Sequence, residues 1–416
     1  MLRVEKIIIA RLVKRVKSGH ALASASSRPE GSVSSIRLRE VQFDDFAAVS
    51  SLKSRHKLKH DSLANWERLW KFNPAIEGGG RLPMGWALEG EEGIVGYIGN
   101  IPLRCFHEGK PLRVAATHGL VVQAGYRTYT SRLVSAYCRQ KGVDLLLSTS
   151  AAETPAKIFE AFKAQPLPQA DYRTALFWVF NARIFLKTMQ KKLRVGGPLG
   201  TFGTCVGAPL VRAEQALRRR GPRPHPQRCE IRELPPSAIG DDFDAFWRKK
   251  LAHTSRLIAD RSAETLRWYF DIPGDQRRPV VLRCDYGGRM AGYAVVVTTI
   301  IEGVMKKAWL VDMLVEDEES SVPRELLIAA MEYARRTKHD VFEVIGFPRS
   351  IRRVCYEWNP YLRTHSSYVF RATERGLHAA LGSEEAWYAT PYDGDAMLMP
   401  DYSSAIPLRA NSSSLV

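Results

Sequence analysis

Residues 118–147, HGLVVQAGYRTYTSRLVSAYCRQKGVDLLL, carry the strongest local signal for the fold. Residues 118–123 form a short apolar run with β-branched valines, which is typical of a buried strand. A glycine and small hydroxylated residues then break the pattern. From Ser131 onward, apolar side chains recur at helical spacing until Gly142 ends the helix. Residues 144–147 begin another apolar run, so the stretch predicts a strand, a tight turn, a helix and a second strand.

The predicted turn suits an anion. The first backbone N–H groups of a helix have no partner within the helix, and the helix dipole places positive charge at the same end. A strand that leads through a tight turn into a helix presents these groups at one point. We therefore expect the turn at residues 124–130 to suit a phosphate or a pyrophosphate.

The composition is that of a folded protein with an unusually basic surface. Of 416 residues, 45% are hydrophobic and 25% are charged, which is ordinary for a globular protein and excludes the disordered and fibrous classes. The formal net charge is +17. Such a charge favours an anionic partner, either nucleic acid, an acidic membrane surface or a phosphorylated ligand. A basic surface that serves only solubility is the alternative.

The six cysteines favour neither a metal site nor a disulfide framework. They stand far apart in the sequence, without a CxxC pair or a neighbouring histidine cluster. This spacing predicts no bound metal and indicates a reducing, cytoplasmic setting.

No apolar run reaches the roughly 18 residues that are needed to cross a bilayer. Residues 1–34 combine scattered basic residues with an end rich in Ser, Ala and Gly, which makes them a poor secretory signal. We expect a basic arm and linker there, with an amphipathic helix lying on a membrane as the alternative. The expected location is the cytoplasm, and a peripheral place at the inner face of the membrane stays open.

The order of elements recurs later in the chain, which indicates a duplicated domain. In both halves, two helices precede a hairpin, and a strand, a helix and a strand follow. Matching residues stand 196 positions apart: Gly96 and Gly292, Tyr97 and Tyr293, Tyr137 and Tyr333, Arg139 and Arg335, and Asp144 and Asp340. One offset from hairpin to strand favours a duplication, and so long a unit excludes an array of repeats of roughly 20–50 residues.

These observations divide the chain into five parts. After the arm at 1–34, a first domain is expected at 35–170, a connector at 171–236, a second domain at 237–372 and a C-terminal extension at 373–416. The connector joins an aromatic, apolar stretch to a basic, loop-like one. That combination suits an interfacial membrane contact, and a helical connector with a solvated basic end is the alternative.

An antiparallel meander followed by a strand, turn, helix and strand resembles the GCN5-related N-acetyltransferase (GNAT) fold. The fused pair is similar to N-myristoyltransferases, to Fem-type aminoacyltransferases and to bacterial tandem acyltransferase-like proteins associated with cell-envelope polysaccharide genes. The resemblance implies an α/β (α+β) protein of two GNAT-like domains, each with a mixed, mostly antiparallel sheet flanked by helices. It also implies an acyl-CoA, such as acetyl-CoA, as the acyl donor.

In that family the turn carries R/Q-x-x-G-x-G/A, and its backbone amides hold the coenzyme A pyrophosphate. The first half reads QAGYRTYT at 123–130, so Thr128 and Thr130 stand where the family has glycines, and their hydroxyl groups could donate to phosphate. The second half has four consecutive carboxylates at 316–319, which would repel a pyrophosphate. The resemblance therefore implies a cofactor in the first half, at Val121, Val122, Gln123, Arg127, Thr128, Tyr129, Thr130 and Ser131.

Acylation of an amine needs a base for the ammonium proton and an acid near the leaving thiolate. His118, just before the turn, titrates in a useful range and is the first candidate base, with a buried core histidine as the alternative. Glu153 follows the second strand and could reach the same cleft, or could serve as a carboxylate at a helix N-terminus. Asp312 lies within an apolar strand of the second half, either as a substrate contact or in a structural ion pair. Tyr129 and Tyr356 are candidate acids.

Two carboxylates, Asp393 and Asp395, flank one glycine near the C-terminus. They are candidates for binding an amino or hydroxylated acceptor. Simple turn residues are the alternative.

Three functions remain open from the sequence. The leading one is an acyltransferase that moves an acyl group from acyl-CoA to an amine or hydroxyl of a small molecule, such as an amino sugar or a cell-envelope precursor. The second is Fem-type transfer from aminoacyl-tRNA, the one case in which nucleic acid is expected as a partner. The third is a non-catalytic pair that acts as a binding subunit in envelope assembly.

Overall fold

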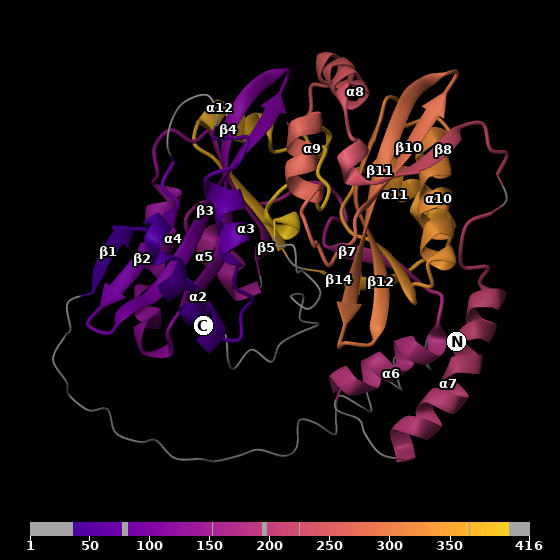
Figure 1. The fold of residues 1–416 in the computed structure, drawn as a ribbon, viewed down its shortest axis with the longest axis horizontal. Helices are drawn as coiled ribbons and strands as arrows, with labels where there is room; N and C mark the ends of the chain where they lie inside the picture. Colours follow the sequence, from indigo (N-terminus) through magenta and orange to yellow (C-terminus); the bar gives the residue numbers. More distant parts are fainter. Residues whose placement is uncertain are drawn as a thin grey trace. The chain divides into compact units, whose positions relative to one another are not determined.

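The computed structural model describes the chain from Ile36 to Leu398 with short gaps. The described residues are 36–76, 82–151, 153–193, 198–223, 225–365 and 367–398. The expected basic arm at 1–34 and the end of the C-terminal extension lie outside this part of the chain. Figure 1 shows two sheets, each accompanied by helices.

The first sheet has eight strands in the order β1-β2-β3-β4-β5-β15-β6, with β9 paired to β3. The strands are β1 (Arg37–Glu40), β2 (Gly85–Gly90), β3 (Gly93–His107), β4 (Lys110–Val122), β5 (Leu145–Ala151), β6 (Gln165–Pro166), β9 (Ile258–Ala259) and β15 (Ser367–Ala372). β4 and β5 are parallel, and the other neighbouring strands are antiparallel.

The second sheet has seven strands in the order β14-β7-β13-β12-β11-β10-β8. The strands are β7 (Thr174–Val179), β8 (Glu230–Leu234), β10 (Val280–Tyr286), β11 (Arg289–Ile301), β12 (Met305–Val315), β13 (Val341–Val344) and β14 (Tyr361–Thr364). Here too one pair, β12 and β13, is parallel and the rest are antiparallel. Both sheets are therefore mixed and mostly antiparallel, as predicted.

The helices are α2 (Phe46–Arg55), α3 (Leu63–Trp70), α4 (Thr130–Cys138), α5 (Glu153–Ala161), α6 (Ala182–Leu193), α7 (Pro198–Leu217), α8 (Asp241–His253), α9 (Ala263–Phe270), α10 (Val322–Arg336), α11 (Arg349–Glu357) and α12 (Arg375–Ala380). Short 3-10 helices are η1 (Phe43–Asp45), η2 (Ala124–Tyr129), η3 (Pro236–Ala238), η4 (Glu384–Ala386) and η5 (Asp395–Met397). None of the helices in the described ranges is long and apolar enough to cross a membrane.

The stretch that predicts the fold forms the elements expected of it, with two differences. β4 is continuous from Lys110 to Val122, so the strand expected at 118–123 is the end of a longer one. The turn is wound into η2, and α4 begins at Thr130. β5 follows after a short loop.

The duplication seen in the sequence is also a structural one. Asp144 donates its N–H to the Arg113 carbonyl at 2.8 Å, and its carboxylate accepts from the Arg113 N–H at 2.8 Å. Asp340 makes the same two bonds with Lys306, at 2.7 and 2.8 Å. The two aspartates are one of the pairs that stand 196 positions apart, so equivalent residues make equivalent contacts.

The two halves exchange a strand. β7 follows the first half along the chain but pairs with β13 of the second sheet, and β15 follows the second half but pairs with β5 of the first sheet. Sheet membership thus departs from the expected division. β7 and β8 fall within the expected connector at 171–236, and β15 falls within the expected second domain at 237–372. The physical reason is that strand pairing is decided by where the chain crosses in space, which local composition does not encode.

A C-terminal segment, residues 387–398, contacts both sheets. In the second sheet, the Tyr392 N–H donates to the Val311 carbonyl of β12 at 3.0 Å. In the first sheet, the Asp395 N–H donates to Thr149 Oγ1 of β5 at 3.0 Å. The segment therefore links the two halves at a second place besides the exchanged strands.

One glycine makes the passage of the 387–398 segment along β5 possible. Gly394 has a φ of +140°, and a Cβ there would lie 2.2 Å from Cγ2 of Thr149. A side chain would be strained in that backbone conformation and would also clash with the threonine. The position therefore requires glycine.

Candidate functional site

The turn after β4 is closed by its own hydrogen bonds. The Tyr126 N–H donates to the Gln123 carbonyl at 2.8 Å, and Thr130 Oγ1 donates to the Arg127 carbonyl at 2.7 Å. The Thr130 hydroxyl hydrogen is therefore used within the turn. Donation from Thr130 to a phosphate, as expected from the sequence, would require its hydroxyl to leave the Arg127 carbonyl.

The residues expected to hold the cofactor differ in exposure. Val121 is buried in the core, Thr128 and Ser131 are exposed, and the others are half-buried: Val122, Gln123, Arg127, Tyr129 and Thr130. Within the described chain, Nε of Arg127 is buried and has no hydrogen-bond partner. The first residues of η2, Ala124 and Gly125, are exposed, and the N–H groups at the start of such a helix lack partners inside it. The start of η2, next to Arg127 in the chain, is the part of the turn best suited to an anion.

His118 lies on β4 in a buried polar cluster. Its Nε2 is 3.0 Å from Oδ2 of Asp61, and Nζ of Lys53 donates to the same oxygen at 3.0 Å. The exposed fraction of each of the three side chains is at most 4%. Burial alone would raise the pKa of the Asp61 carboxyl, but His118 and Lys53 together hold that pKa well below its usual range. Asp61 is therefore ionised and binds the imidazole and the ammonium at once.

Tyr97 contributes a hydroxyl group to the same region. It is fully buried, and its hydroxyl has no hydrogen-bond partner among the described residues. Nζ of Lys53 lies 5.1 Å from the centre of the Tyr97 ring. Burial, and to a lesser degree Asp61, raise the pKa of Tyr97 well above its usual value. Gly99 leaves room for the ring, because a Cβ there would lie 2.5 Å from the tyrosine hydroxyl.

The polar cluster lies where β4 and β5 stop pairing. Their parallel ladder spans only three residue pairs. Beyond it, the Thr117 hydroxyl donates to Ser148 Oγ at 2.9 Å, and His118 follows directly on β4. On β5 the next residue is Thr149, whose hydroxyl donates to the Asp395 carboxylate. His118 and the 387–398 segment therefore occupy the end of the same parallel pair.

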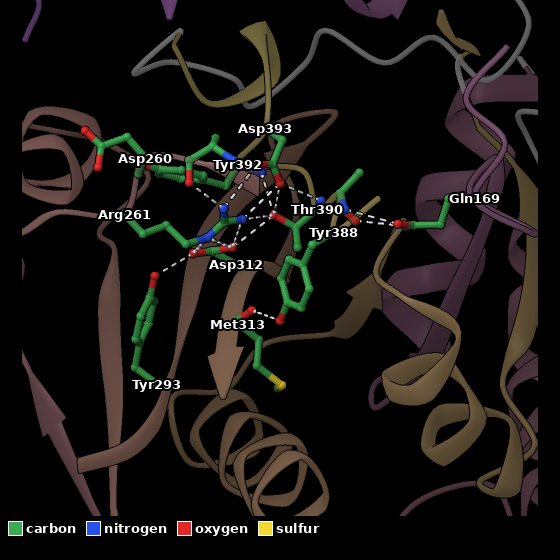
Figure 2. Close-up of polar contacts among 12 residues, drawn as sticks. Gln169, Asp260, Arg261, Tyr293, Asp312, Met313, Tyr388, Thr390, Tyr392 and Asp393 are labelled. Carbon is green, nitrogen blue, oxygen red and sulfur yellow. Dashed lines mark hydrogen bonds and ion pairs between the residues drawn. The ribbon is translucent and has the colours of Figure 1, made fainter. Parts of the chain in front are cut away.

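In the second half, Asp312 is at the centre of a buried ion-pair network (Figure 2). Arg261 binds the Asp312 carboxylate through NH2 at 2.9 Å and through Nε at 3.1 Å. The Thr390 and Tyr293 hydroxyls each donate to Asp312 at 2.9 Å. The Asp312 and Arg261 side chains have no exposed surface. Asp312 therefore sits in an ion pair inside the protein, with its oxygens bound by protein groups.

The two carboxylates expected to bind an acceptor also face protein groups. Oδ2 of Asp393 accepts from Arg261 NH2 at 2.9 Å, and Oδ1 accepts from the Ala259 N–H at 3.1 Å. Burial raises the pKa of Asp393, although Arg261 opposes this effect. Asp395 binds Thr149 of β5, as described above, and both carboxylates are buried. In this structure they anchor the 387–398 segment.

His118 and Asp312 occupy the same place in the two halves. In the antiparallel pairing with the preceding strand, His118 is opposite Gly99 and Asp312 is opposite Val295. Gly99 and Val295 stand 196 positions apart, which is the offset of the repeat. The conspicuous aspartate and the candidate base therefore lie opposite equivalent residues of the preceding strand, next to a register shift in each half.

Their partners are equivalent as well. Asp61 and Arg261 each stand directly before the N-cap serine of a helix, Ser62 for α3 and Ser262 for α9. In the first half the carboxylate comes from this loop and the nitrogen base from the strand. In the second half the charges are reversed, since the loop supplies the guanidinium and the strand supplies the carboxylate.

The acidic turn of the second half is largely neutralised by neighbouring cations. The ion pairs are Glu316 with Lys249 at 2.5 Å and with Arg289 at 3.3 Å, Glu318 with Arg256, and Glu319 with Arg353 at 2.5 Å. These pairs reduce the repulsion of a pyrophosphate that the sequence suggested for residues 316–319.

No protein-family model matches the chain, and no curated protein matches it in sequence. Solved structures do match its fold. A GCN5-related N-acetyltransferase from Anabaena variabilis is similar with a TM-score of 0.51 and 8% identity, over 82% of this chain and 73% of that one. The N-myristoyltransferase of Saccharomyces cerevisiae, solved with bound myristoyl-CoA, is similar with a TM-score of 0.50 and 12% identity, over 83% of this chain and 82% of that one. The chain has the GNAT fold. This confirms the fold class expected from the sequence.

Within this GNAT fold, the remaining candidates lie apart from the His118 cluster or outside the described side chains. Glu153 is the first residue of α5, and nothing is described of its side chain. Tyr129 is half-buried beneath the guanidinium of Arg132. Tyr356 is exposed and donates to Asp171 at 3.1 Å. Among the described residues, no three His, Cys, Asp or Glu side chains come together as a metal site.

The sequence did not single out Asp61, Lys53 or Arg261, which complete the two clusters of the GNAT halves. Lys53 lies on α2 among other basic residues, so nothing in its neighbourhood marks it. Asp61 and Arg261 do carry a signal. Each precedes the N-cap serine at an equivalent place of the repeat, and the charge at this place is opposite in the two halves. This reversal of charge is the signal that could have singled them out.

Proposed function

We propose that this protein transfers an acyl group from acyl-CoA to an amine or a hydroxyl group, and that the first half carries the reaction. The observation that carries the proposal is the position of His118. It lies two residues beyond the last pair of the β4–β5 ladder, and the ionised Asp61 binds its ring. The fold supports the same class. The Anabaena variabilis protein is an N-acetyltransferase by name, and the yeast enzyme binds myristoyl-CoA.

In the proposed reaction, the acceptor nitrogen or oxygen attacks the thioester carbonyl. A new C–N or C–O bond forms, the C–S bond breaks, and coenzyme A leaves as a thiolate that takes a proton from solvent. His118 accepts the acceptor's proton on the ring nitrogen that does not face Asp61. Asp61 stabilises the imidazolium that results. Because the His118 side chain is only 4% exposed, an acceptor reaches it only when covering groups move.

The proposal puts the donor's pyrophosphate at the exposed start of η2. The short helix offers N–H groups there, and Arg127 supplies a cation within the same turn. In the second half, the equivalent turn carries four carboxylates. Three of these carboxylates already bind the nearby cations Lys249, Arg256 and Arg353, whereas Nε of Arg127 in the first half has no partner among the described residues. This difference favours the first half for the donor.

Thermal unfolding with coenzyme A, acetyl-CoA and longer acyl-CoAs tests donor binding. A ligand that binds the native state raises the melting temperature, with about 2.7 kcal/mol of stabilisation at a hundred times its Kd. We expect Arg127→Ala to weaken this shift and Arg132→Ala, a change on the exposed face of α4, to leave it unchanged. No shift with any acyl-CoA at millimolar concentration would refute donor binding.

A variant at His118 separates chemistry from binding. We expect His118→Gln to abolish acyl transfer from acetyl-CoA to an amine while it leaves the shift produced by coenzyme A in place. Retention of wild-type transfer in this variant would exclude His118 as the base.

The acceptor is proposed at a finer level, as an amino sugar or another cell-envelope precursor. The same assays distinguish the two other functions. Binding of aminoacyl-tRNA that weakens steeply with salt, without a shift by acyl-CoA, favours Fem-type transfer. A protein that binds a precursor but neither acyl-CoA nor tRNA is a non-catalytic binding subunit.

We also propose that the α6–α7 hairpin contacts an anionic membrane from the cytoplasmic side. Three cations, Arg183, Lys187 and Lys191, recur every four residues on α6 and are exposed, so they share one face. Leu210 and Leu217 stand seven residues apart on α7 and are 64% and 78% exposed. Exposed cations and exposed leucines on two helices that pack together are the combination that binds an acidic lipid surface.

Sedimentation with lipid vesicles tests the membrane contact. We expect the protein to bind vesicles that contain phosphatidylglycerol and not pure phosphatidylcholine vesicles. The double variant Lys187→Glu, Lys191→Glu should lose most of this binding, whereas Lys110→Glu, Lys141→Glu, which makes the same charge change at exposed sites of the first half, should keep it. Equal binding by the two double variants would assign the effect to overall charge.

A further inference from the structure

Two cavities flank one ion pair of the second half. The first has a volume of about 390 Å³ and lies between the end of α8 and the turn after β12. The second has a volume of about 250 Å³ and lies next to the start of α11 and to η4. Arg256 lines both cavities, and it forms a two-pronged ion pair with Glu318, which lines the second.

The ion pair is the boundary between the cavities. Glu318 is held by Arg256 and by the Ser350 hydroxyl, which donates to it at 2.6 Å. Lys250 lines the first cavity, and its Nζ lies 3.7 Å from Glu318 across this boundary. A ligand that spans Arg256 and Glu318 would therefore touch both cavities.

The two cavities have opposite charge excess. The first is lined by three cations, Lys249, Lys250 and Arg256, against the carboxylates Glu316 and Asp317. The second is lined by two cations, Arg256 and Arg349, against the carboxylates Glu318, Glu384 and Glu385. An anionic group is thus favoured on one side of the ion pair and a cationic group on the other.

Lys250 lines the first cavity and has only long polar contacts, to the Glu316 carbonyl at 3.2 Å and to the Glu318 carboxylate at 3.7 Å. Its side chain is only 9% exposed, and burial lowers its pKa although Glu318 opposes this effect. Lys249 is bound to Glu316, but Glu316 has a second cation, Arg289, at 3.3 Å. Lys249 can therefore turn to a ligand without leaving Glu316 unpaired.

In the second cavity, one carboxylate oxygen of Glu384 has no hydrogen-bond donor among the described residues. This oxygen, Oε1, is buried. A buried carboxylate oxygen without a donor costs free energy, which an ammonium group of a ligand would recover. Lys250 and Glu384 line different cavities, one on each side of the Arg256–Glu318 pair.

We propose that the two cavities form one binding site for a small phosphorylated amine, with the phosphate between Lys249, Lys250 and Arg256 and the ammonium group at Glu384. Three cations converge on the first cavity, which suits a phosphate dianion better than a single-charged carboxylate. The cavity volume is within the range of small-molecule sites. This site is centred on an ion pair of the second half and does not depend on the acyl-CoA turn of the first.

Equilibrium binding to the full-length protein, by isothermal titration calorimetry, tests the site with four probes. They are glucosamine 6-phosphate, glucose 6-phosphate, glucosamine and inorganic phosphate. We expect glucosamine 6-phosphate to bind at least about ten-fold more tightly than any of the other three, because only it satisfies both cavities. Equal affinity for glucosamine 6-phosphate and inorganic phosphate would reduce the site to an adventitious anion contact and overturn the proposal.

Two variants assign each group to its cavity. Lys250→Met should remove the preference for glucosamine 6-phosphate over glucosamine, and Glu384→Gln should remove its preference over glucose 6-phosphate. Lys187→Met and Glu357→Gln, on exposed helix surfaces outside both cavities, should change neither preference. Loss of both preferences in one variant, with an unfolding transition like that of the wild type, would contradict the separate roles.

Binding in these experiments is measured without acyl-CoA. A failure of this site therefore leaves the proposed acyl transfer untouched, and absence of an acyl-CoA shift leaves this site untouched.

Discussion

At Asp312, a carboxylate with no exposed surface is balanced by Arg261 and by two hydroxyl groups. Replacing it with asparagine leaves the Arg261 guanidinium buried with less opposing charge. Removal of one member of a buried ion pair costs about 3–5 kcal/mol. We therefore expect Asp312→Asn to lower the free energy of unfolding by about 3 kcal/mol or more, measured by urea unfolding.

The control for this change is an exposed ion pair. Glu357 binds Arg324 at 2.7 Å, and their side chains are 42% and 25% exposed. Solvent screens such a pair, so Glu357→Gln should cost no more than about 1 kcal/mol. Similar losses in the two variants would mean that burial does not govern the strength of the Asp312 network.

His339 is a buried histidine that the fold keeps neutral. Burial, followed by the charge of Lys306, lowers its pKa to about 4, against roughly 6.5 for an exposed histidine. Its ring nitrogens lie 2.9 Å from the hydroxyls of Thr298 and Thr337. The folded pKa is below the unfolded one, so the stability linked to His339 is complete above pH 6.5 and is lost as the pH falls toward 4.

We expect His339→Gln to flatten the loss of stability between pH 6.5 and 4. Urea unfolding at several pH values measures this slope. The exposed His60 gives the matched control, since His60→Gln should keep the wild-type slope. An unchanged slope in His339→Gln would mean that other groups carry the acid sensitivity.

Single residues show how far the sequence could predict the site. An aspartate inside an apolar strand predicts that Asp312 needs a partner. It does not say that the partner is Arg261, 51 positions earlier, because the loop before α9 has no periodicity that fixes where its side chains point. The same holds for His118 and Asp61, which are 57 positions apart. Each partner is determined by the packing of a loop on a strand.

At the scale of elements, the strand, turn, helix and strand of residues 118–147 could be predicted because each is set by neighbouring residues. Apolar spacing distinguishes β4 from α4, and Gly142 ends the run between α4 and β5. The pairing of the exchanged strands, β7 and β15, could not be predicted. The apolar, aromatic residues of β7 fall within the expected connector, and their sequence does not tell which parallel pair the strand will extend.

The 387–398 segment supplies a prediction at this scale. Gly394 has a φ of +140°, and a Cβ there would overlap the Thr149 side chain. We expect Gly394→Ala to cost about 2 kcal/mol or more, because strain and overlap add. Hydrogen exchange should show the loss first in residues 387–398, which would then protect their amides less.

Gly376 provides the comparison. It lies in α12, and a Cβ there would meet nothing within 4 Å. Replacing a helix glycine with alanine usually stabilises by roughly 0.4–1 kcal/mol. If Gly394→Ala were as stable as Gly376→Ala, the result would contradict the close contact of Gly394 with Thr149 on β5.

At the scale of the whole molecule, the exchange of β7 and β15 ties the halves together. Each half supplies a strand that the other sheet needs, so neither half has a complete sheet of its own. The repeat in the sequence predicted two domains, and it did so correctly for the order of elements. It could not predict the exchange, because the repeat relates each strand to its counterpart and does not say which of the two sheets a strand joins.

We expect a chain cut between α7 and β8 to stay in one piece. A protease site inserted after Arg223 would leave β7 on the first fragment and β15 on the second. The nicked protein should elute as one species in size-exclusion chromatography without denaturant and separate only in urea. Separation in native buffer would contradict the exchange, and so would a cooperative unfolding transition of residues 36–170 expressed alone.

The exchanged strand β15 also determines when the first sheet can be completed during synthesis. β1 begins at residue 37 and β15 at residue 367, so the ribosome adds 330 residues between the first and the last strand of one sheet. β5 ends at residue 151, so its edge waits while about 216 more residues are added, which takes roughly 11 to 43 seconds at about 5–20 residues per second. During that time the nascent chain presents an unpaired strand edge, the kind of surface that chaperones cover. An mRNA that ends before codon 367 gives a product without β15, so the edge of β5 stays unpaired. We expect chaperones to bind such a product at this edge, in its N-terminal half.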